Sequence, residues 1–552
     1  MGKANKSRGL AALAVIGALA LTSACGQAGS QSAQTSSGEP VKGGTLKVIQ
    51  VPDDYGCVDP FQTFWTGSRT VVRQFAESLT DQDPKTGEIK PWLASGWKQS
   101  DDGKTLDVDL KHGITFSDGE KFDADAVVAN FKTDITTAKE IPGTYGSLYI
   151  QNLSDVSKVD DDTVRFSFDA PNASFLQGLS TTNLALISPK SLELSAKERC
   201  TAALAGTGSF VLKSFSTTSS TKLVRREGHT WKSPFQKNDG DAYLDAIEIS
   251  YAAEPSVRIG SLTGGQVDVL WPDSDHALNE NEVNQIKQAG GTVDSRSLPG
   301  TAFNLFPNVR YGRPLSDINV RKAFSYAIDR KTYASTILRS DYPVVSGFLD
   351  SSTPGVAPQQ ENVTYDPKKA GELLDKAGWK LNKSDGYRYK NGKKLTLTLL
   401  TYTKNEGHEL VQDQVKKVGI DYKIDVTTAA EENSRMASGD YDFLGDTFTR
   451  GDLSALNRVL DLRYSSWKDE TRNIATDAQH AQFAKFFDEG TAQLDQTKRT
   501  EIYRQVQDYL GDNFILTPIY ERVQDYATLG KAQGIRFTSE AFADFHDAWL
   551  AQ

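Results

Sequence analysis

Two β-α-β units, separated by about 150 residues in a chain of 552, constrain the fold more than any other feature. The first unit has a strand, a helix and a strand at 247–251, 254–263 and 267–270. The second unit has the same order of elements at 395–400, 409–418 and 422–426. A strand, helix and strand in succession build a parallel sheet locally. Two units this far apart therefore predict two α/β lobes rather than one continuous sheet.

The regions around these units also carry clear helix and strand signals. Ser316 or Asp317 can cap a helix whose apolar face lies within 320–328, and Asp366 can cap a second helix that starts at Pro367. The region 75–205 mixes both element types, with alternating strands at 104–110 and 163–168 and a helix that Asp123 can cap. We expect a mixed α+β subdomain there.

The N-terminus is similar to a lipoprotein export signal. Lys3, Lys6 and Arg8 precede an apolar run over 10–21, which is shorter than the roughly 20 residues that a membrane-spanning helix needs. The run Leu-Thr-Ser-Ala-Cys ending at Cys25 resembles the lipobox of bacterial lipoproteins, in which the cysteine is lipidated. We expect a signal peptide over 1–24, a lipid on Cys25 and a polar, flexible tether over 25–40. The alternative is an ordinary secretory signal with an incidental cysteine.

Two further cysteines, Cys57 and Cys200, remain in the chain. In an exported protein an even pair of cysteines favours a disulfide, and two buried free thiols are the alternative.

Composition and motifs argue against several classes of function. The net charge of −10 disfavours general nucleic-acid binding, which needs a basic surface. The six histidines are scattered, and the sequence contains no HExxH, Gly-x-Ser-x-Gly, Walker A or GxGxxG motif. We therefore expect no catalytic residues, no cofactor and no metal site, and we predict that the protein is not an enzyme.

The stretch INVRKAFSYAIDR, at 318–330, is the most diagnostic of several segments that follow one another along the chain. Together these segments resemble the family 5 extracellular solute-binding proteins, the peptide- and nickel-binding receptors of ABC importers. Others are similar to the family's long second block (77–131), its GTGPF turn, its Gly-x-x-Asp element and its Ala-x-x-Leu-Leu-x-x-Ala-Gly helix (GTGSF at 206–210, LTGGQVDVL at 262–270 and YDPKKAGELLDKAGW at 365–379).

This resemblance implies an α/β, two-lobed, periplasmic-binding-protein-like fold with an extra subdomain in the N-terminal lobe and a ligand cleft between the lobes. Lobe I is expected over 41–72, 206–298 and 515–552, its extra subdomain over 73–205, and lobe II over 299–514. The return of the C-terminus to lobe I is implied by the resemblance alone.

The resemblance also implies a function and a set of partners. The protein is expected to be a monomer, anchored by lipid to the outer face of the cytoplasmic membrane, that closes around a solute and delivers it to ABC permease subunits. A di- or oligopeptide is the first expected ligand. A nickel chelate, an opine, an oligosaccharide or glutathione are alternatives, and a receptor without an import role or an extracytoplasmic hydrolase are more distant ones.

Five residues are candidate ligand contacts: Tyr55, Trp271, Asp446, Arg450 and Asp452. Tyr55 and Trp271 are aromatic residues near strand ends in lobe I, where they suit an amphipathic cleft. Peptide-binding members of the family carry a Trp-x-x-Asp stretch after the Tyr-Asp strand of lobe II, and here Asp446 and Asp452 remain without the Trp. Arg450 could instead bind a carboxylate. Each charged residue could equally be a solvated loop charge, and each aromatic residue could belong to the core.

Overall fold

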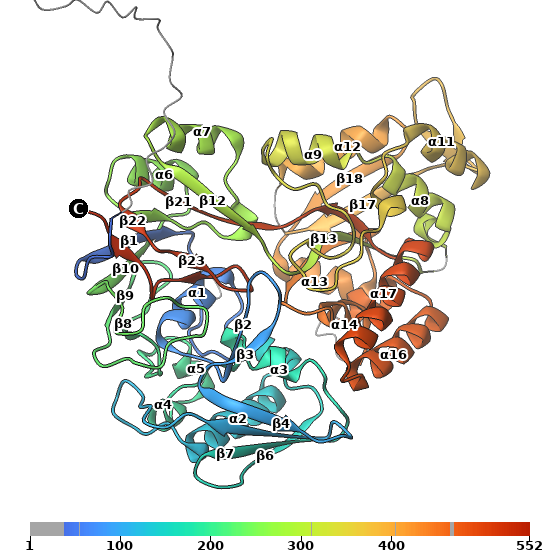
Figure 1. Ribbon diagram of the computed structural model, residues 1–552. Coiled ribbons are helices and arrows are strands. Elements are labelled where there is room, and N and C mark those ends of the chain that lie inside the picture. The colour runs from blue at the N-terminus through green and yellow to red at the C-terminus, as the bar shows by residue number, and fades with distance from the viewer. Residues whose placement is uncertain (1–37, 54–55, 311, 403–404, 464–467) are drawn as a thin grey trace, which may run out of the picture. The chain divides into compact units, whose positions relative to one another are not determined.

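Two large sheets, each with helices packed against it, organise the chain (Figure 1). The computed structural model describes residues 38–53, 56–310, 312–402, 405–463 and 468–552. The expected signal peptide, Cys25, the tether before residue 38 and Tyr55 lie outside the described residues. Within the described ranges, no helix combines the length and the apolar character that crossing a membrane requires.

The sheet of lobe I has seven strands in the order β12-β21-β11-β1-β10-β9-β8. The strand β1 lies at its centre, parallel to both β10 and β11, so that it separates the two strands of the first β-α-β unit. The helix α6 (Pro255–Thr263) connects β10 to β11. The strand bounds are β1 (Thr45–Gln50), β8 (Phe210–Ser214), β9 (Ser220–Arg225), β10 (Ala246–Tyr251), β11 (Val269–Leu270), β12 (Thr292–Ser297) and β21 (Val523–Thr528).

The sheet of lobe II has five strands in the order β18-β17-β19-β13-β20. The second β-α-β unit is present as β17, α12 and β18, with β17 and β18 parallel. The strand bounds are β13 (Gly300–Pro307), β17 (Thr396–Thr401), β18 (Asp421–Val426), β19 (Phe443–Thr449) and β20 (Thr517–Tyr520). The main helices are α8 (Ile318–Tyr326), α11 (Pro367–Lys376), α12 (Glu406–Lys416), α13 (Ala429–Ser438), α14 (Ala455–Leu460), α15 (Lys468–Asn473), α16 (Asp477–Ala492) and α17 (Gln496–Asn513).

Helix starts follow the capping residues that the sequence indicates. Asp317 accepts a hydrogen bond from the backbone of Asn319 at the start of α8, and Asp366 accepts one from Lys369 at the start of α11. The apolar face of α8 is fully buried at Val320, Ala323 and Phe324. Burial of this face against the sheet, rather than helix propensity, therefore holds α8 in place.

The expected subdomain contains a four-stranded antiparallel sheet, in the order β4-β5-β7-β6, covered by α2 (Ala124–Glu140). Asp123 caps α2 by accepting a hydrogen bond from the backbone of Ala126. Phe131 of α2 packs edge-on against Phe166 of β7, with ring centroids 4.8 Å apart. The strand bounds are β4 (Ala94–Gln99), β5 (Thr105–Leu110), β6 (Leu153–Lys158) and β7 (Thr163–Phe168).

Two short segments join the sheets of lobe I and lobe II (Figure 1). One runs from β12 to β13 through Leu298, and the other runs from β20 to β21 through Arg522; the Leu298 backbone N–H donates to the Arg522 carbonyl at 3.1 Å. Arg522 Nε also donates to Asp350 at 2.9 Å, and both side chains are buried. Because β20 belongs to the sheet of lobe II, the chain returns to lobe I after Tyr520 rather than at the expected residue 515.

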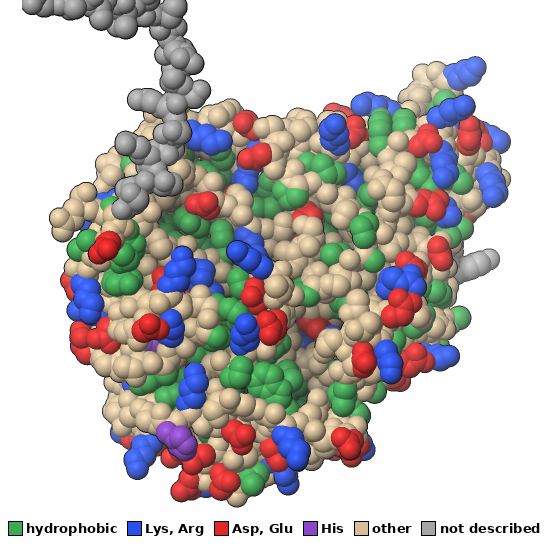
Figure 2. All heavy atoms as spheres, viewed as in Figure 1, with side chains coloured by type: hydrophobic (Ala, Val, Ile, Leu, Met, Phe, Trp, Pro, Cys, Tyr) green, Lys and Arg blue, Asp and Glu red, His purple; other side chains and the backbone are tan. Residues whose placement is uncertain are grey.

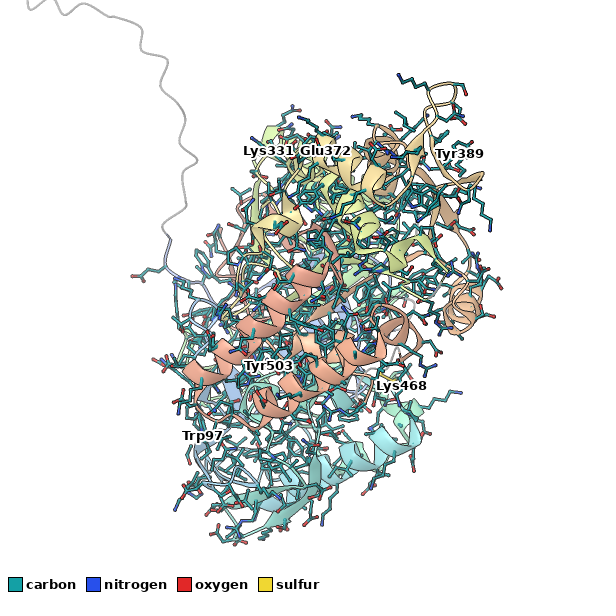
Figure 3. The ribbon with its side chains drawn as sticks, turned by 90° about the vertical axis from the view of Figure 1, so that its right-hand side faces the viewer. Trp97, Lys331, Glu372, Tyr389, Lys468 and Tyr503 are labelled. Carbon is teal, nitrogen blue, oxygen red and sulfur yellow. A yellow bond between two sulfur atoms is a disulfide. The ribbon has the colours of Figure 1, made fainter. Side chains whose placement is uncertain are left out.

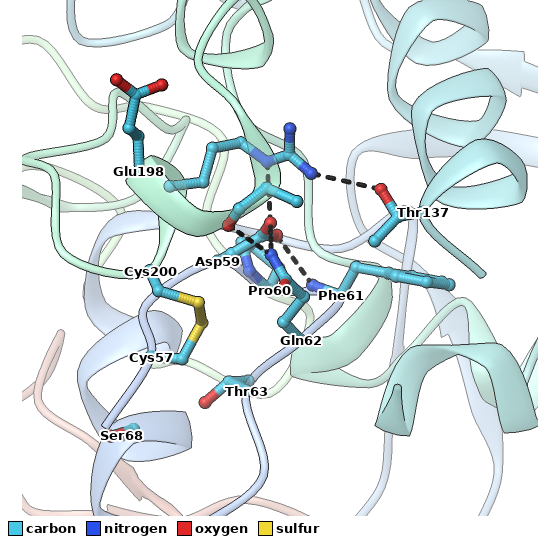
Figure 4. Close-up of a disulfide and its surroundings, with 12 residues drawn as sticks. Cys57, Asp59, Pro60, Phe61, Gln62, Thr63, Ser68, Thr137, Glu198 and Cys200 are labelled. Carbon is cyan, nitrogen blue, oxygen red and sulfur yellow. Dashed lines mark hydrogen bonds and ion pairs between the residues drawn. A yellow bond between two sulfur atoms is a disulfide. The ribbon is translucent and has the colours of Figure 1, made fainter. Parts of the chain in front are cut away.

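A disulfide joins Cys57, in the segment after β1, to Cys200 (Figure 4). Beside it, the buried Arg199 side chain donates from Nε to Asp59 at 2.7 Å. The Val58 backbone N–H donates to the Cys200 carbonyl at 3.0 Å. These contacts fix the segment that leads from β1 to α1 (Thr66–Phe75) onto the extra subdomain.

The last two helices of lobe II pack against each other (Figure 3). Tyr503 of α17 lies against Gly490 of α16, where an added Cβ would come within 2.9 Å of the tyrosine ring. Any larger residue at position 490 would therefore force the two helices apart.

Candidate ligand cleft

A cavity of about 490 Å³ lies between the two sheets and is lined from both lobes. We call it the cleft. Lobe I contributes the residues that follow β1 and β11 and the start of α1, and lobe II contributes parts of β13, β17, β19, α12, α13 and α15. Such a volume is typical of small-molecule sites.

Strand direction explains which residues of lobe I reach the cleft. Ile49 of β1 pairs with Leu270 of β11 in a parallel register, so Gln50 and Trp271 follow at the same edge of the sheet. The carboxyl ends of parallel strands are the usual place for ligands in open α/β sheets. The Trp271 ring stacks on Tyr526, with centroids 5.6 Å apart and an interplanar angle of 10°.

Gln50 and Trp271 are both buried, with 2% and 1% of their surfaces exposed. Among the residues that the structure describes, neither the Gln50 amide nor the Trp271 Nε1 has a hydrogen-bond partner. The Gln50 amide oxygen lies 3.3 Å from the position that a Cβ at Gly67 would occupy, so glycine at 67 leaves room for it at the start of α1. Buried polar groups without partners are rare in proteins, and a bound ligand is one way to satisfy them.

Acidic side chains after β11 form the next part of the lobe I wall. Asp273 accepts hydrogen bonds from the backbone N–H groups of Asp275 and His276, and its carboxylate lies 2.7 Å from His276 Nδ1. That contact raises the pKa of His276. Asp275 lines the cleft with an exposed side chain, and the surrounding protein together with the Asp273 charge raises the pKa of its carboxyl to about 6.

The wall from lobe II is centred on Asp446 of β19, which forms an ion pair with Arg458 of α14. Glu432 of α13 and Glu470 of α15 also line the cleft and are buried. Desolvation, together with the Asp446 charge, raises the pKa of Glu432 to about 7. Desolvation and Asp446 also raise the pKa of Glu470, against the opposing effect of Arg458. Three carboxyl groups thus converge on this wall beside one arginine.

The sequence candidates divide into two groups in the structure. Trp271 and Asp446 line the cleft from opposite lobes. Arg450 and Asp452 do not line it: Arg450 donates to Gln177 and to the Leu148 carbonyl and lies over the Tyr149 ring, 4.6 Å from its centroid. Asp452 forms an ion pair with Arg499, with hydrogen bonds of 2.6 and 2.7 Å. Their side chains are engaged in packing the extra subdomain against lobe II.

Other lining residues were not among the candidates, namely Gln50, Asp275, His408, Glu432 and Glu470. The ends of the parallel strands could have indicated Gln50, because β1 is recognisable in the sequence. Glu432 and Glu470 lie on helices with no distinctive pattern, so no local signal marks them. Within the described ranges, no group of three or more His, Cys, Asp or Glu side chains is placed to hold a metal ion.

Two α/β lobes, joined by two crossing segments and enclosing a cleft, define a binding protein of the periplasmic type. Residues 88–468 match the family model for bacterial extracellular solute-binding proteins, family 5, middle domain. The chain belongs to this family, as the sequence resemblance implies, and its family places its work outside the cytoplasm.

Relatives of known function are similar over most of their length. The oligopeptide-binding protein AppA of Bacillus subtilis is 26% identical over 571 residues, covering 99% of this chain and 100% of the relative. The glutathione-binding protein GsiB of Escherichia coli is 28% identical over 394 residues, covering 71% of this chain and 70% of the relative. The crystal structure of NikA from Brucella suis with Fe(III)-EDTA has a TM-score of 0.79 at 21% identity, over 92% of this chain and 100% of that one.

Proposed function

We propose that this protein is the extracytoplasmic receptor of an ABC importer, which captures a small solute in the cleft and delivers it to a membrane permease. The observation that carries this proposal is a cleft lined from both lobes, whose sheets are joined by two crossing segments. A ligand held by both walls favours the closed arrangement, and closure removes most of its surface from water.

Di- and oligopeptides are the first ligand class to test. The oligopeptide-binding relative supports this choice. A nickel chelate, an opine, an oligosaccharide and glutathione are the alternatives, and the glutathione-binding relative supports the last of them.

The receptor leaves its ligand chemically unchanged. Binding and hinge closure need no nucleophile and no activated water, and the relatives compared above are binding proteins. On the face shown in Figure 2, Lys and Arg side chains are interspersed with Asp and Glu, which suits a solute receptor better than a nucleic-acid partner. We expect the protein to act as a monomer, with the permease as its protein partner.

The membrane attachment is a lipid on Cys25. Changing Cys25 to Ser is expected to move the protein from the membrane fraction to the soluble fraction, measured by fractionation of cells. A variant that remains in the membrane fraction would contradict the lipid anchor and leave the receptor role intact.

Ligand-induced closure tests the receptor role directly. Native mass spectrometry of the purified protein should reveal a co-purified solute by its mass, and small-angle scattering should show compaction when that solute is added back. The same solute should raise the melting temperature, because a ligand that binds only the folded state stabilises it. A solute that is released with altered mass after incubation would instead favour an extracytoplasmic hydrolase.

A further inference from the structure

The charge of the cleft wall is strongly one-sided. Six carboxylates line it, and none of its described lining residues is a lysine or an arginine. The carboxylates are Asp53, Asp273, Asp275, Glu432, Asp446 and Glu470. His276 and His408 are the basic lining residues, and burial lowers the pKa of His408 to about 4, so that it is neutral at physiological pH.

Only some of these acids have a partner within the protein. Asp53 accepts from Ser68, Asp273 contacts His276, and Asp446 pairs with Arg458. Within the described ranges, no hydrogen bond reaches the carboxylates of Asp275, Glu432 or Glu470. Glu432 and Glu470 are buried next to other carboxylates, which is costly in the empty protein, whereas Asp275 adds an exposed negative charge to the same wall.

The same cavity contains neutral polar groups that could form hydrogen bonds with a ligand. The Gln50 amide and Trp271 Nε1 line the cleft, are at least nine-tenths buried, and have no partner among the described residues. Apolar surface lies beside them at Phe64, Phe303 and Leu444. The cavity therefore offers hydrogen-bonding groups and apolar surface as well as negative charge.

Among the described lining residues, a free carboxylate on the ligand would find no lysine or arginine, and His276 already contacts Asp273. Arg450, the candidate for that role, is held outside the cleft by Gln177, Leu148 and Tyr149. Arg458 already faces Asp446, and Arg522 faces Asp350 in the crossing segments. A carboxylate brought into the cleft would be repelled by the acids that line it.

We propose that the solute is an organic cation, with amine or guanidine groups on a partly apolar frame and no free carboxylate inside the cleft. This inference rests on the proposed receptor function and names the class of solute. A peptide meets the requirement when its C-terminal carboxylate is blocked or remains outside the cavity. The ammonium or guanidinium group replaces the missing cation beside Asp275, Glu432 and Glu470.

Binding of a cation should then depend on pH. Glu432 faces Asp446 and Glu470, and Glu470 in turn faces Arg458. Asp275 faces Asp273, His276, Asp446 and Arg522. A cation favours the ionised form of both acids, so binding releases protons wherever those acids are protonated beforehand. Affinity is expected to rise as the pH increases from about 5.5 to 8, because the pKa of Asp275 is about 6 and that of Glu432 is about 7. Loss of the His276 proton over the same range acts in the same direction.

Matched pairs of ligands test the inference with the whole chain. Agmatine is compared with arginine, cadaverine with lysine, and the amide of a Lys-Lys dipeptide with the free acid, by thermal shift and calorimetry at pH 7.5. The member without a carboxylate should bind at least about tenfold more tightly in the pairs that bind. Equal or tighter binding of the carboxylate-bearing members, or no binding by any carboxylate-free member, would overturn the proposal.

Variants and other solutes separate this inference from the receptor role. Glu432→Gln and Asp275→Asn should each weaken binding of the best cation at least fivefold, whereas Asp508→Asn, which changes an exposed acid of α17, should leave it unchanged. If neutral sugars, glutathione or Ala-Ala bind and compact the protein while the cations do not, the cation inference fails and the receptor function stands. If no solute of any charge shifts the melting temperature or compacts the protein, the receptor function fails too.

Discussion

Two sets of buried acids in this protein have opposite properties, and arginine makes the difference. Outside the cleft, Asp452 pairs with Arg499, and Asp544 pairs with Arg73 and Arg536. Burial opposes their ionisation, but the arginines outweigh it and lower the pKa of both carboxyls. In the cleft, burial beside Asp446 raises the pKa of Glu432 and Glu470 instead.

The comparison separates acids that are neutralised within the fold from acids that we propose are neutralised by a ligand. A buried acid with two hydrogen bonds from arginine is neutralised within the fold. Removing either partner leaves an unpaired charge in the interior. A buried acid among other acids is costly in the folded state, and a cation from outside can relieve it. The same residue type therefore has a structural role in one place and, in our proposal, a binding role in the other.

The largest effect is expected where a structural pair is broken. Arg499→Met keeps much of the side-chain volume but leaves Asp452 buried without its cation, so unfolding should require about 3–5 kcal/mol less free energy. Urea unfolding measures this, and ligand affinity should be unchanged in the folded variant. The matched control is Arg504→Met, which breaks an exposed pair with Asp508 and should cause no measurable change. Similar losses in both variants would contradict the distinction.

A buried histidine without an acidic partner should change stability with pH in the direction opposite to that of the cleft acids. Burial lowers the pKa of His408 to about 4, so the unfolded chain takes up a proton more readily than the folded protein. The free energy of unfolding should therefore fall, by about 2–3 kcal/mol from this group, as the pH drops from about 6.5 to 4. The difference between wild type and His408→Gln, followed by urea unfolding across this range, isolates the effect. A difference that does not vary with pH would contradict it.

Glu432 should act in the opposite direction. Its pKa of about 7 in the folded protein lies above the ordinary glutamate value, so its contribution to stability is present at low pH and is lost as the pH rises from about 4.5 to 7. Glu432→Gln should be more stable than wild type at pH 8 by about 1–2 kcal/mol, less than the full shift implies because solvent still reaches part of the carboxylate. Urea unfolding at pH 5 and pH 8 measures this. A variant less stable at pH 8 would show that the charge is already satisfied.

The smallest effect on stability is expected at Gln50. Gln50→Leu removes a buried amide without partners, so stability should change by less than about 1 kcal/mol, while affinity for the ligand should fall about five- to twentyfold. Gln74 is the matched control, since it is equally buried but its amide donates to Thr70 and Ala543 and accepts from Phe545. Gln74→Leu should cost about 1–3 kcal/mol of stability and leave affinity unchanged. The reverse pattern would place the ligand elsewhere.

Local patterns in the sequence determined the elements and their class. Alternation at 247–251 and 422–426 predicted β10 and β18. Ser316 or Asp317, of which Asp317 is the cap, predicted the start of α8, and Asp366 predicted the start of α11. These predictions hold because capping and periodicity act over a few residues, and burial of one face reinforces them. The family motifs added the two-lobed arrangement, which the sheets confirm.

The tertiary structure alone decided which polar residues meet in the cleft. Asp446 and Asp452 are six positions apart in the same stretch. Asp446 lies in β19 and lines the cavity, whereas Asp452 lies after β19 and pairs with Arg499 outside the cavity. Glu432, Glu470 and Asp275 converge from two helices and the opposite lobe, and no local pattern relates them. The charge of the site depends on which side chains are neighbours in space, because desolvation and Coulomb interactions act over distance and not along the chain.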